Sequence, residues 1–277
     1  DERTQKYESI MYASFCMRFS YFRHPSSVTH HPTPITQHPS IMKIALLGYG
    51  KMGKTIEKLA LEKGYSIVFK STSESSEGNF EDAEVAIEFS SPEAAGENIS
   101  KALKAGIPII SGTTGWLDKY DEMVNLCKNR NGSFIYASNF SVGVNLFFSI
   151  NEYAAKLMAK WKDYNVSVEE IHHLQKKDAP SGTAITIAEG ILKHSDKKDW
   201  KLNTSEKNTL NITAKREEDV KGTHIVSYDS SIDAISLKHE AHSREGFALG
   251  AILAAEFLKD KKGIFTMKDV LGLKIND

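Results

Sequence analysis

The feature that most constrains the fold is a short apolar run that leads directly into a loop of spaced glycines. The run "KIALL" (43–47) is typical of a buried strand, and "GYGKMG" after it places Gly48, Gly50 and Gly53 in the G-x-G-x-x-G spacing. Apolar residues then recur at helical spacing until Gly64, a natural helix stop. In such a turn the first glycine permits a tight bend, the second admits a pyrophosphate at the helix N-terminus, and the third lets helix and strand pack. The pattern predicts a dinucleotide-binding turn, although a strand–helix turn that only needs glycines would have the same letters.

Strands and helices alternate along the next part of the chain. Helical patterns cover 92–105 and 117–129, and Pro92 suits a first helical turn. The strand-like runs are apolar on both faces, as in sheets covered by helices, and they span 65–70, 84–89, 107–111 and 133–137. This alternation predicts βαβ units, and therefore an α/β fold with a Rossmann-type, doubly wound parallel sheet.

The pattern changes after residue 140. A helix is predicted over 145–161, an alternating strand begins at Tyr164, and another helix has its apolar face over 184–192. Three strand-like runs follow at 209–216, 222–230 and 233–241. We expect an α+β domain with an open mixed or antiparallel sheet over 141–243. The final helix, 247–260, has a broad apolar face and should return to the first domain, which would then comprise 42–140 and 244–277.

The first 41 residues differ from the rest. They contain "FRHPSSVTHHPTPITQHPS", which has no periodicity, and four of the seven prolines precede Met42. No apolar stretch there is long enough for a signal peptide. We interpret residues 1–41 as a disordered leader or an upstream extension, with a targeting segment as the alternative. The folded protein is expected to begin at Met42.

Composition excludes several classes of function. The 35 basic and 36 acidic side chains leave a net charge of -1, so no global field favours nucleic acid or an anionic membrane. Cys16 and Cys127 form no zinc-type spacing, which indicates a reducing, cytoplasmic location. No apolar run reaches the roughly 18 residues of a membrane-spanning helix. The ten histidines are scattered, and no metal site is expected.

The end of the second predicted strand bears on the choice of nucleotide. An acidic residue there would bind the adenosine ribose, but this chain has Phe69, Lys70, Ser71 and Thr72. One cation and no acid favour NADPH, with use of both nucleotides open and a solvated Lys70 as the alternative. Three polar stretches, "EFSSPE", "SGTTGW" and "YASNFSVG", follow successive strands. Because ligands bind beyond the carboxyl ends of such strands, these stretches should line a nicotinamide crevice.

The stretch "EEIHHLQKKDAPSGTA" (169–184) combines groups suited to an anionic substrate. His172 and His173 end a predicted strand, Lys176 lies in the loop, and Ser181 begins a helix. A capped helix start offers backbone N–H groups to a carboxylate, a lysine adds charge, and a histidine can donate a proton near neutral pH. The combination suits a small dicarboxylate that is bound and protonated. A basic loop before a capped helix is the simpler alternative.

Together these stretches resemble the 4-hydroxy-tetrahydrodipicolinate (dihydrodipicolinate) reductase family of bacterial lysine and diaminopimelate biosynthesis. The match includes "HEAHSREGFALGA" near the end and runs from Met42 through the rest of the chain. H-H-x-x-K-x-D-A-P-S-G-T-A is the specific part, whereas the glycine loop is shared widely. The resemblance implies a cytoplasmic homotetramer, assembled through the second domain's sheet, that reduces its cyclic dicarboxylate with NADPH or NADH.

The resemblance also implies residue roles. His172 would be the proton donor and acceptor, and Lys176 the second proton donor. Substrate carboxylates would contact His173, Lys176, Ser181, Gly182 and Thr183. The nucleotide would contact Gly48, Gly50, Lys51, Met52, Gly53, Lys70, Phe89, Ser90, Gly112, Thr113, Thr114, Ala137, Ser138, Asn139 and Phe140.

Two positions depart from the family pattern. Leu174 and Gln175 replace the basic or histidine residues that many members carry between the second histidine and the lysine, and Lys70 replaces the usual acid or arginine. Two rival functions remain at the level of sequence. A related dehydrogenase acting on aspartate or homoserine would lack the histidine–lysine motif, and a non-catalytic dinucleotide sensor would need no proton donor.

Overall fold

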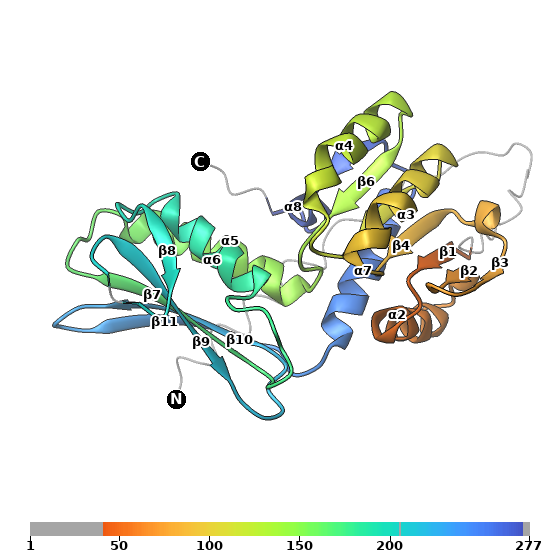
Figure 1. The fold of residues 1–277 in the computed structure, drawn as a ribbon. Coiled ribbons are helices and arrows are strands. Elements are labelled where there is room, and N and C mark those ends of the chain that lie inside the picture. Colours follow the sequence, from red (N-terminus) through yellow and green to blue (C-terminus); the bar gives the residue numbers. More distant parts are fainter. Residues whose placement is uncertain (1–40, 205, 274–277) are drawn as a thin grey trace, which may run out of the picture. The chain divides into compact units, whose positions relative to one another are not determined.

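A computed structural model describes residues 41–273 except 205, and this part of the chain contains two β-sheets (Figure 1). Within it, seven strands form the first sheet in the order β12-β6-β5-β4-β1-β2-β3. All neighbours pair in parallel except β2 and β3. The strands are β1 (Lys43–Leu47), β2 (Ser66–Ser71), β3 (Ser76–Gly78), β4 (Val85–Glu88), β5 (Ile109–Ser111), β6 (Ser133–Tyr136) and β12 (Gly263–Phe265).

Helices cover both faces of the first sheet. One apolar core joins the sheet to α2 (Lys51–Glu62), α7 (Glu245–Leu258) and α8 (Met267–Val270). A second core, on the opposite face, contains α3 (Pro92–Lys104), α4 (Tyr120–Asn129) and the short helix η1 (Phe80–Asp82). The predicted α/β class with a doubly wound, Rossmann-type sheet is therefore confirmed.

The second sheet is mixed, as the sequence predicted. Its described strands run in the order β11-β10-β7-β9-β8. The three strands β7, β9 and β8 are parallel, while β10 and β11 are antiparallel to their neighbours. The strands are β7 (Asn165–His172), β8 (Asp199–Leu202), β9 (Thr209–Arg216), β10 (Thr223–Asp229) and β11 (Ala234–Glu240). Helices α5 (Val142–Met158) and α6 (Gly182–Leu192) pack on it through one apolar core (Figure 1).

Several predicted boundaries were wrong. Helix α5 begins at Val142 rather than 145, because the Ser141 hydroxyl caps it by accepting from the N–H of Val144. The helix predicted over 117–129 is broken into η2 (Leu117–Lys119) and α4. There, the buried Trp116 indole donates to the carbonyl of Thr113 at 2.8 Å, which holds the start of this segment against the preceding loop.

The C-terminal part of the described chain lies on the first sheet. Strand β12 pairs with β6, and α7 packs against α2 and the middle strands. The exact domain boundaries remain a prediction, and the expectation for residues 1–41 falls, apart from Ile41, outside the described residues. No helix in the described ranges is long and apolar enough to cross a membrane.

Candidate active site

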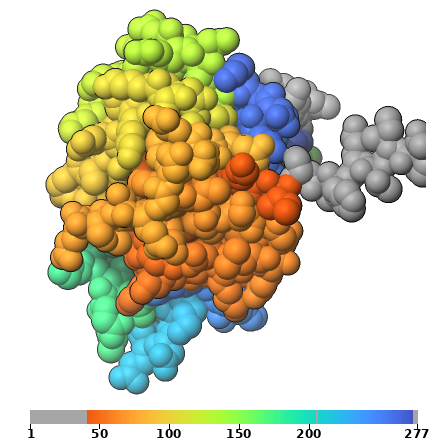
Figure 2. Space-filling view, turned by 90° about the vertical axis from the view of Figure 1, so that its right-hand side faces the viewer, coloured from red at the N-terminus to blue at the C-terminus, as the bar shows by residue number. Residues whose placement is uncertain are grey.

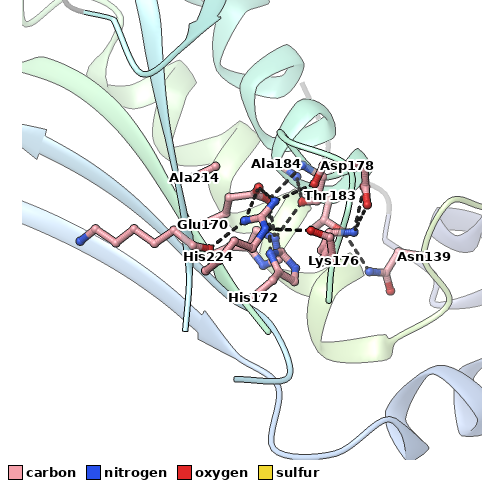
Figure 3. A network of polar contacts seen from close by, with 12 residues as sticks. Asn139, Glu170, His172, Lys176, Asp178, Thr183, Ala184, Ala214 and His224 are labelled. Carbon is pink, nitrogen blue, oxygen red and sulfur yellow. Dashed lines mark hydrogen bonds and ion pairs between the residues drawn. The ribbon is translucent and has the colours of Figure 1, made fainter. Parts of the chain in front are cut away.

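The side chains of β7 alternate between the two faces of the second sheet. Val166 and Val168 are buried in the core with α6, and the same face continues with Glu170 and His172, which are 0% and 8% exposed. Because a strand repeats every two residues, an apolar face that becomes polar at its end brings both groups to one place. There, beside the start of α6, Figure 3 shows a network of polar contacts.

Both carboxylate oxygens of Glu170 have partners. Oε1 accepts hydrogen bonds from the Arg216 guanidinium at 3.3 and 3.4 Å, and Oε2 accepts from the backbone N–H of Ser181 at 3.0 Å. Oε2 also lies 3.5 Å from Nδ1 of His172 and 4.0 Å from Nε2 of His224. The carboxylate and the two imidazoles are within 4.8 Å of one another, a spacing that metal sites also use. Here the carboxylate already pairs with a guanidinium, and the absence of a metal site stays a prediction.

The two buried histidines differ in their electrostatic surroundings. Their rings meet edge to face with centroids 5.1 Å apart. The pKa of His172 is lowered, mainly by burial and further by the charges of Lys176 and Arg216, while the Glu170 carboxylate acts to raise it. Burial lowers the pKa of His224 to about 3, so this imidazole is neutral near pH 7. Both imidazoles therefore have a pKa below the ordinary value of a histidine, and only His172 has a carboxylate that acts strongly to raise it.

Lys176 lies in the loop between β7 and α6. Its ammonium donates to both carboxylate oxygens of Asp178, at 2.9 and 2.8 Å. Arg216 donates to the backbone carbonyls of Lys176 at 3.3 Å and Asp178 at 2.6 Å, which holds the loop against β9. Burial acts to raise the pKa of Asp178, but the hydrogen bond and charge of Lys176 outweigh it and the pKa is lowered.

The start of α6 has the geometry of an anion-binding site. The Ser181 hydroxyl is the N-cap and accepts from the N–H of Ala184 at 3.2 Å. The N–H groups of Gly182 and Thr183, in the first turn, have no intrahelical acceptor. A Cβ on Gly182 would meet no atom within 4 Å, so the backbone here borders open space. A carboxylate can approach these N–H groups closely.

One cavity of about 570 Å³ brings the two halves of the predicted site together. Asn139, which follows β6, donates from Nδ2 to the Thr183 hydroxyl at 3.2 Å, as Figure 3 shows. The cavity therefore joins residues predicted for the nucleotide with residues predicted for the substrate. Its lining includes Met52, Thr114, Ser138 and Asn139 from the first set and His172, His173, Lys176, Ser181, Gly182 and Thr183 from the second.

The three loop glycines have three different surroundings. A Cβ on Gly48, where φ is +98°, would lie 2.0 Å from the carbonyl oxygen of Phe89. A Cβ on Gly53 would lie 2.4 Å from the carbonyl oxygen of Gly48. A Cβ on Gly50 would meet nothing within 4 Å. The first and third glycines are thus required by packing, whereas the second leaves the helix N-terminus open to a ligand.

A second cavity, of about 340 Å³, lies along this loop. It borders Gly48, Gly50, Phe89 and Ser90 among the predicted residues, together with Ser71 at the end of β2 and Thr72 and Ser73 after it. Figure 2 shows the molecule from the side of this nucleotide half, whose red-to-yellow segments, which include α2 and α3, form most of the surface in that view. The hydroxyl-rich end of β2 therefore lies beside the glycine loop, as expected for a ribose site.

The fully buried Glu88 connects the loops behind this groove. Its carboxylate accepts from the N–H of Ser90 at 2.9 Å, the Thr113 hydroxyl at 2.8 Å and the Ser111 hydroxyl at 2.6 Å. The ring of Phe89 fills the space that a Cβ on Gly112 would take. Several residues predicted to bind the nucleotide thus stabilise the loops through these contacts.

The remaining predicted residues line neither cavity. Lys51 is exposed, Ala137 is half-buried and Phe140 is fully buried. The Lys70 ammonium is 3.2 Å from Oε1 of Glu57 and 3.7 Å from Oε2 of Glu77, while Oε2 of Glu57 accepts from the Tyr49 hydroxyl. The hydrogen bond to Glu57 is the main cause that raises the pKa of Lys70. The charge of Lys70 is therefore already paired.

Sequence reasoning missed Arg216, His224 and Arg244. Arg216 and His224 reach the site because β9 and β10 flank β7 in registers that pair Arg216 with His172 and His224 with Glu170. Arg244 lies in the quoted stretch "HEAHSREGFALGA"; its Nη2 is 3.4 Å from Nε2 of His173, and it lines the larger cavity. Only Arg244 had a signal in the sequence, as a lone cation in a family-like stretch.

These features define a class of protein. A Rossmann-type sheet with an open glycine loop, joined to a cavity that carries a histidine and a lysine, is that of an NAD(P)-dependent oxidoreductase. Residues 42–140 match the family model described as Dihydrodipicolinate reductase, N-terminus, and residues 143–271 match the one described as Dihydrodipicolinate reductase, C-terminus. The chain belongs to the dihydrodipicolinate reductase family, so the resemblance seen in its motifs is confirmed.

Known relatives agree with this assignment. The chain is 55% identical over 234 residues to the 4-hydroxy-tetrahydrodipicolinate reductase of Christiangramia forsetii, covering 83% of this chain and 98% of that one. It is 37% identical to the reductase of Archaeoglobus fulgidus, covering 69% and 76%. A dipicolinate-bound dihydrodipicolinate reductase from Paenisporosarcina has the same fold, with a TM-score of 0.66, 19% identity and coverage of 82% and 97%. The reaction is the NAD(P)H-dependent reduction of 4-hydroxy-tetrahydrodipicolinate to tetrahydrodipicolinate, in lysine and diaminopimelate biosynthesis.

Proposed function

We propose that His172 donates the proton in this reduction and that Lys176 assists it. The observation that carries the proposal is the single cavity in which both side chains meet the capped start of α6 and four residues of the nucleotide half. His172 has a lowered pKa, but a dicarboxylate in this cavity brings negative charge beside the imidazole. That charge raises the pKa and favours the protonated donor.

The start of α6 would hold one substrate carboxylate. The N–H groups of Gly182 and Thr183, the Thr183 hydroxyl and the Lys176 ammonium supply donors on one side of the cavity. To reach the substrate, Lys176 exchanges its hydrogen bonds with Asp178 for bonds to the incoming carboxylate. His173 and Arg244, which are in contact, would face the other carboxylate. The dipicolinate bound to the Paenisporosarcina reductase is a ligand of this class.

The glycine loop fits a pyridine nucleotide. The open space at Gly50 would admit the pyrophosphate to the N-terminus of α2, and Asn139 and Ser138 would meet the nicotinamide half in the larger cavity. When bound, NAD(P)H supplies the hydride. Asn139 also bonds to Thr183, so it would orient the nucleotide and substrate sides relative to each other.

We propose that both nucleotides are used. Lys70 was expected to favour NADPH, but its charge is paired with Glu57 and Glu77. At the end of β2, the cavity along the glycine loop borders the side chains of Ser71, Thr72 and Ser73. Their hydroxyl groups neither attract nor repel a 2′-phosphate strongly. A preference of a hundredfold or more for either nucleotide would contradict this.

The remaining proposals concern assembly and location. We infer a homotetramer formed through the second sheet, supported by exposed apolar residues near its edge: Ile232 is 91% exposed and Ile235 on β11 is 46% exposed. Light scattering on the purified protein tests this, and a monomer would contradict it. We infer a cytoplasmic location, because a chain with two cysteines in no zinc-type spacing suits a reducing environment.

The test of the whole proposal is a coupled assay. Dihydrodipicolinate synthase generates the substrate, and loss of NADPH or NADH absorbance reports turnover. We expect turnover with both nucleotides. A protein that binds nucleotide without turnover would instead be a sensor.

A further inference from the structure

We propose that the buried Glu170–Arg216 ion pair is a positioning element. It would hold His172, the start of α6 and the Lys176 loop in a fixed arrangement relative to one another. The inference rests on the roles proposed for His172 and Lys176. Neither Glu170 nor Arg216 lines the larger cavity, so both would act through other groups. The pair would be needed for catalysis although it does not touch the reactants.

The carboxylate of Glu170 connects two parts of the site directly. Its Oε2 accepts the N–H of Ser181, which fixes the N-cap of α6 and hence the N–H groups that follow. The same oxygen is 3.5 Å from Nδ1 of His172, a nitrogen that has no hydrogen-bond partner among the residues that the structure describes. Once His172 is protonated, this nitrogen carries a hydrogen facing the carboxylate, which orients the ring.

The guanidinium of Arg216 connects Glu170 to the third part of the site, the loop that carries Lys176. It donates to Oε1 of Glu170 and to the carbonyls of Lys176 and Asp178, so it holds both the carboxylate and the loop that carries the lysine. Arg216 can do this because its donors point in several fixed directions. A lysine at this position would keep the charge but could not span these acceptors.

A buried ion pair of this kind is poor evidence for stability. Removing two charges from water costs about as much as their attraction returns, and apolar residues of similar volume often serve as well. Glu170 is 0% exposed and the Arg216 side chain 20% exposed. Stability alone therefore does not account for the pair, and its contacts with the cap, the histidine and the lysine loop point to a role in catalysis.

The charge of Glu170 also acts on the titration of His172. Among the described residues, Glu170 and Asp178 are the anions that act to raise the pKa of this imidazole, and burial and the cations Lys176 and Arg216 oppose them. Removing the Glu170 charge therefore lowers the pKa of His172 further. The groups concerned are Glu170 on β7, Lys176 and Asp178 in the loop, Arg216 on β9 and His224 on β10.

The strand provides a matched control. Glu169 neighbours Glu170 but points to the other face of β7, where its Oε2 is 2.7 Å from Nζ of Lys215. That pair is exposed, with side-chain exposures of 30% and 48%. The two adjacent glutamates thus pair with two adjacent cations on β9, one pair inside the site and the other at the surface.

The experiment compares Glu170→Gln with Glu169→Gln and wild type across pH, using the coupled assay and calorimetry with dipicolinate. We expect Glu170→Gln to lower kcat about ten- to a hundredfold, because a misplacement of about 1 Å at a reacting group can cost on the order of 10²-fold in rate. Activity that needs protonated His172 falls as pH rises through its pKa, so this falling limb should move to lower pH. Glu169→Gln should leave kcat within about twofold and the limb unmoved.

The variant Arg216→Lys tests separately whether Arg216 positions the Lys176 loop. We expect it to weaken dipicolinate binding and raise the substrate KM about tenfold or more, because the Lys176 loop loses two of its contacts. If Glu170→Gln does not fold, Glu170→Asp replaces it, since a retracted carboxylate should also shift the limb downward.

Three outcomes would overturn the inference. They are a normal kcat in Glu170→Gln, a lower kcat with neither a shifted limb nor weaker dipicolinate binding, and an Arg216→Lys enzyme that binds dipicolinate normally. Failure of the underlying roles looks different, because His172→Ala would then retain activity or the wild type would show none.

Discussion

Glu88 and Glu170 are both fully buried near the ends of strands, one in each sheet, but their partners differ in charge. Glu88 accepts hydrogen bonds only from neutral groups, the hydroxyls and N–H of Ser90, Ser111 and Thr113. Glu170 faces a guanidinium and two imidazoles. The nucleotide half thus uses an anion to fix loop geometry, whereas the substrate half uses one to fix geometry and also to influence a proton donor.

The starts of helices α2 and α6 differ in the groups that they offer to a ligand. Gly50 before α2 and Gly182 in α6 are each open where a Cβ would stand, and each would admit an anion. At α2 the nearby groups are mainly hydroxyls, whereas at α6 a lysine and a histidine share the cavity. Binding is common to both halves, and proton transfer belongs to one.

The largest effect should come from the proton donor. We expect His172→Ala to lower kcat by about 10²- to 10⁴-fold, the contribution typical of a positioned acid, with a much smaller change in KM. Steady-state kinetics in the coupled assay measure both. His194→Ala is the control, because His194 lines a different pocket, and it should leave kcat unchanged. A near-normal kcat in His172→Ala would remove this residue from the mechanism.

The open glycines allow each half to be disturbed alone. Gly50→Ala should raise the nucleotide KM, and Gly182→Ala should weaken dipicolinate binding, each on the order of tenfold to a hundredfold. Neither Cβ meets a protein atom within 4 Å, so both variants should fold normally. Calorimetry with each ligand measures the effects. If either variant weakened the binding of both ligands equally, the nucleotide and dipicolinate sites could not be separate.

Glu88→Gln tests the anion with neutral partners. The amide must turn an N–H₂ group toward hydroxyls that now donate, so we expect a loss of about 1–3 kcal/mol in the free energy of unfolding. The nucleotide KM should rise while the pH profile of kcat keeps its shape. Urea denaturation and the pH profile provide the two measurements. A shifted pH profile would contradict the division of roles between the two glutamates.

The buried His224 predicts a dependence of stability on pH. Its folded pKa is about 3, below the usual value of 6.5, so the unfolded state binds the extra proton. Stability should therefore be complete above about pH 6.5 and fall by at most roughly 1.4 kcal/mol per pH unit below it. Thermal unfolding between pH 7.5 and 5 measures this slope. His224→Asn should be flatter over that range, and an equal slope would assign the effect to other groups.

The smallest effect is expected at the paired lysine. Lys70→Ala should change the ratio of kcat/KM for NADPH and NADH by no more than about fivefold, because the ammonium already pairs with Glu57. Kinetics with both nucleotides decide this. A loss of NADPH activity alone, at tenfold or more, would show that Lys70 leaves Glu57 to bind the 2′-phosphate.

Sequence patterns predicted the parts of the molecule that are local. The first sheet's central strands, the α2 turn and the His172–Thr183 motif were all visible as contiguous stretches. Strands β3, β8 and β12 were missed, since three or four residues carry no reliable period. The positions of Arg216 and His224 depend on how β9 and β10 align with β7, and that register is set by packing rather than by any local signal.

The return of the chain to the first sheet has a consequence for biosynthesis. The apolar face formed by Ile44, Leu46 and Ile87 is covered by α7, which leaves the ribosome after these strands and after the whole second sheet. The second sheet, built entirely from residues between 142 and 240, can be completed earlier. A nascent or truncated chain ending before residue 245 would therefore expose the apolar face of its nucleotide half and be a substrate for chaperones or proteases.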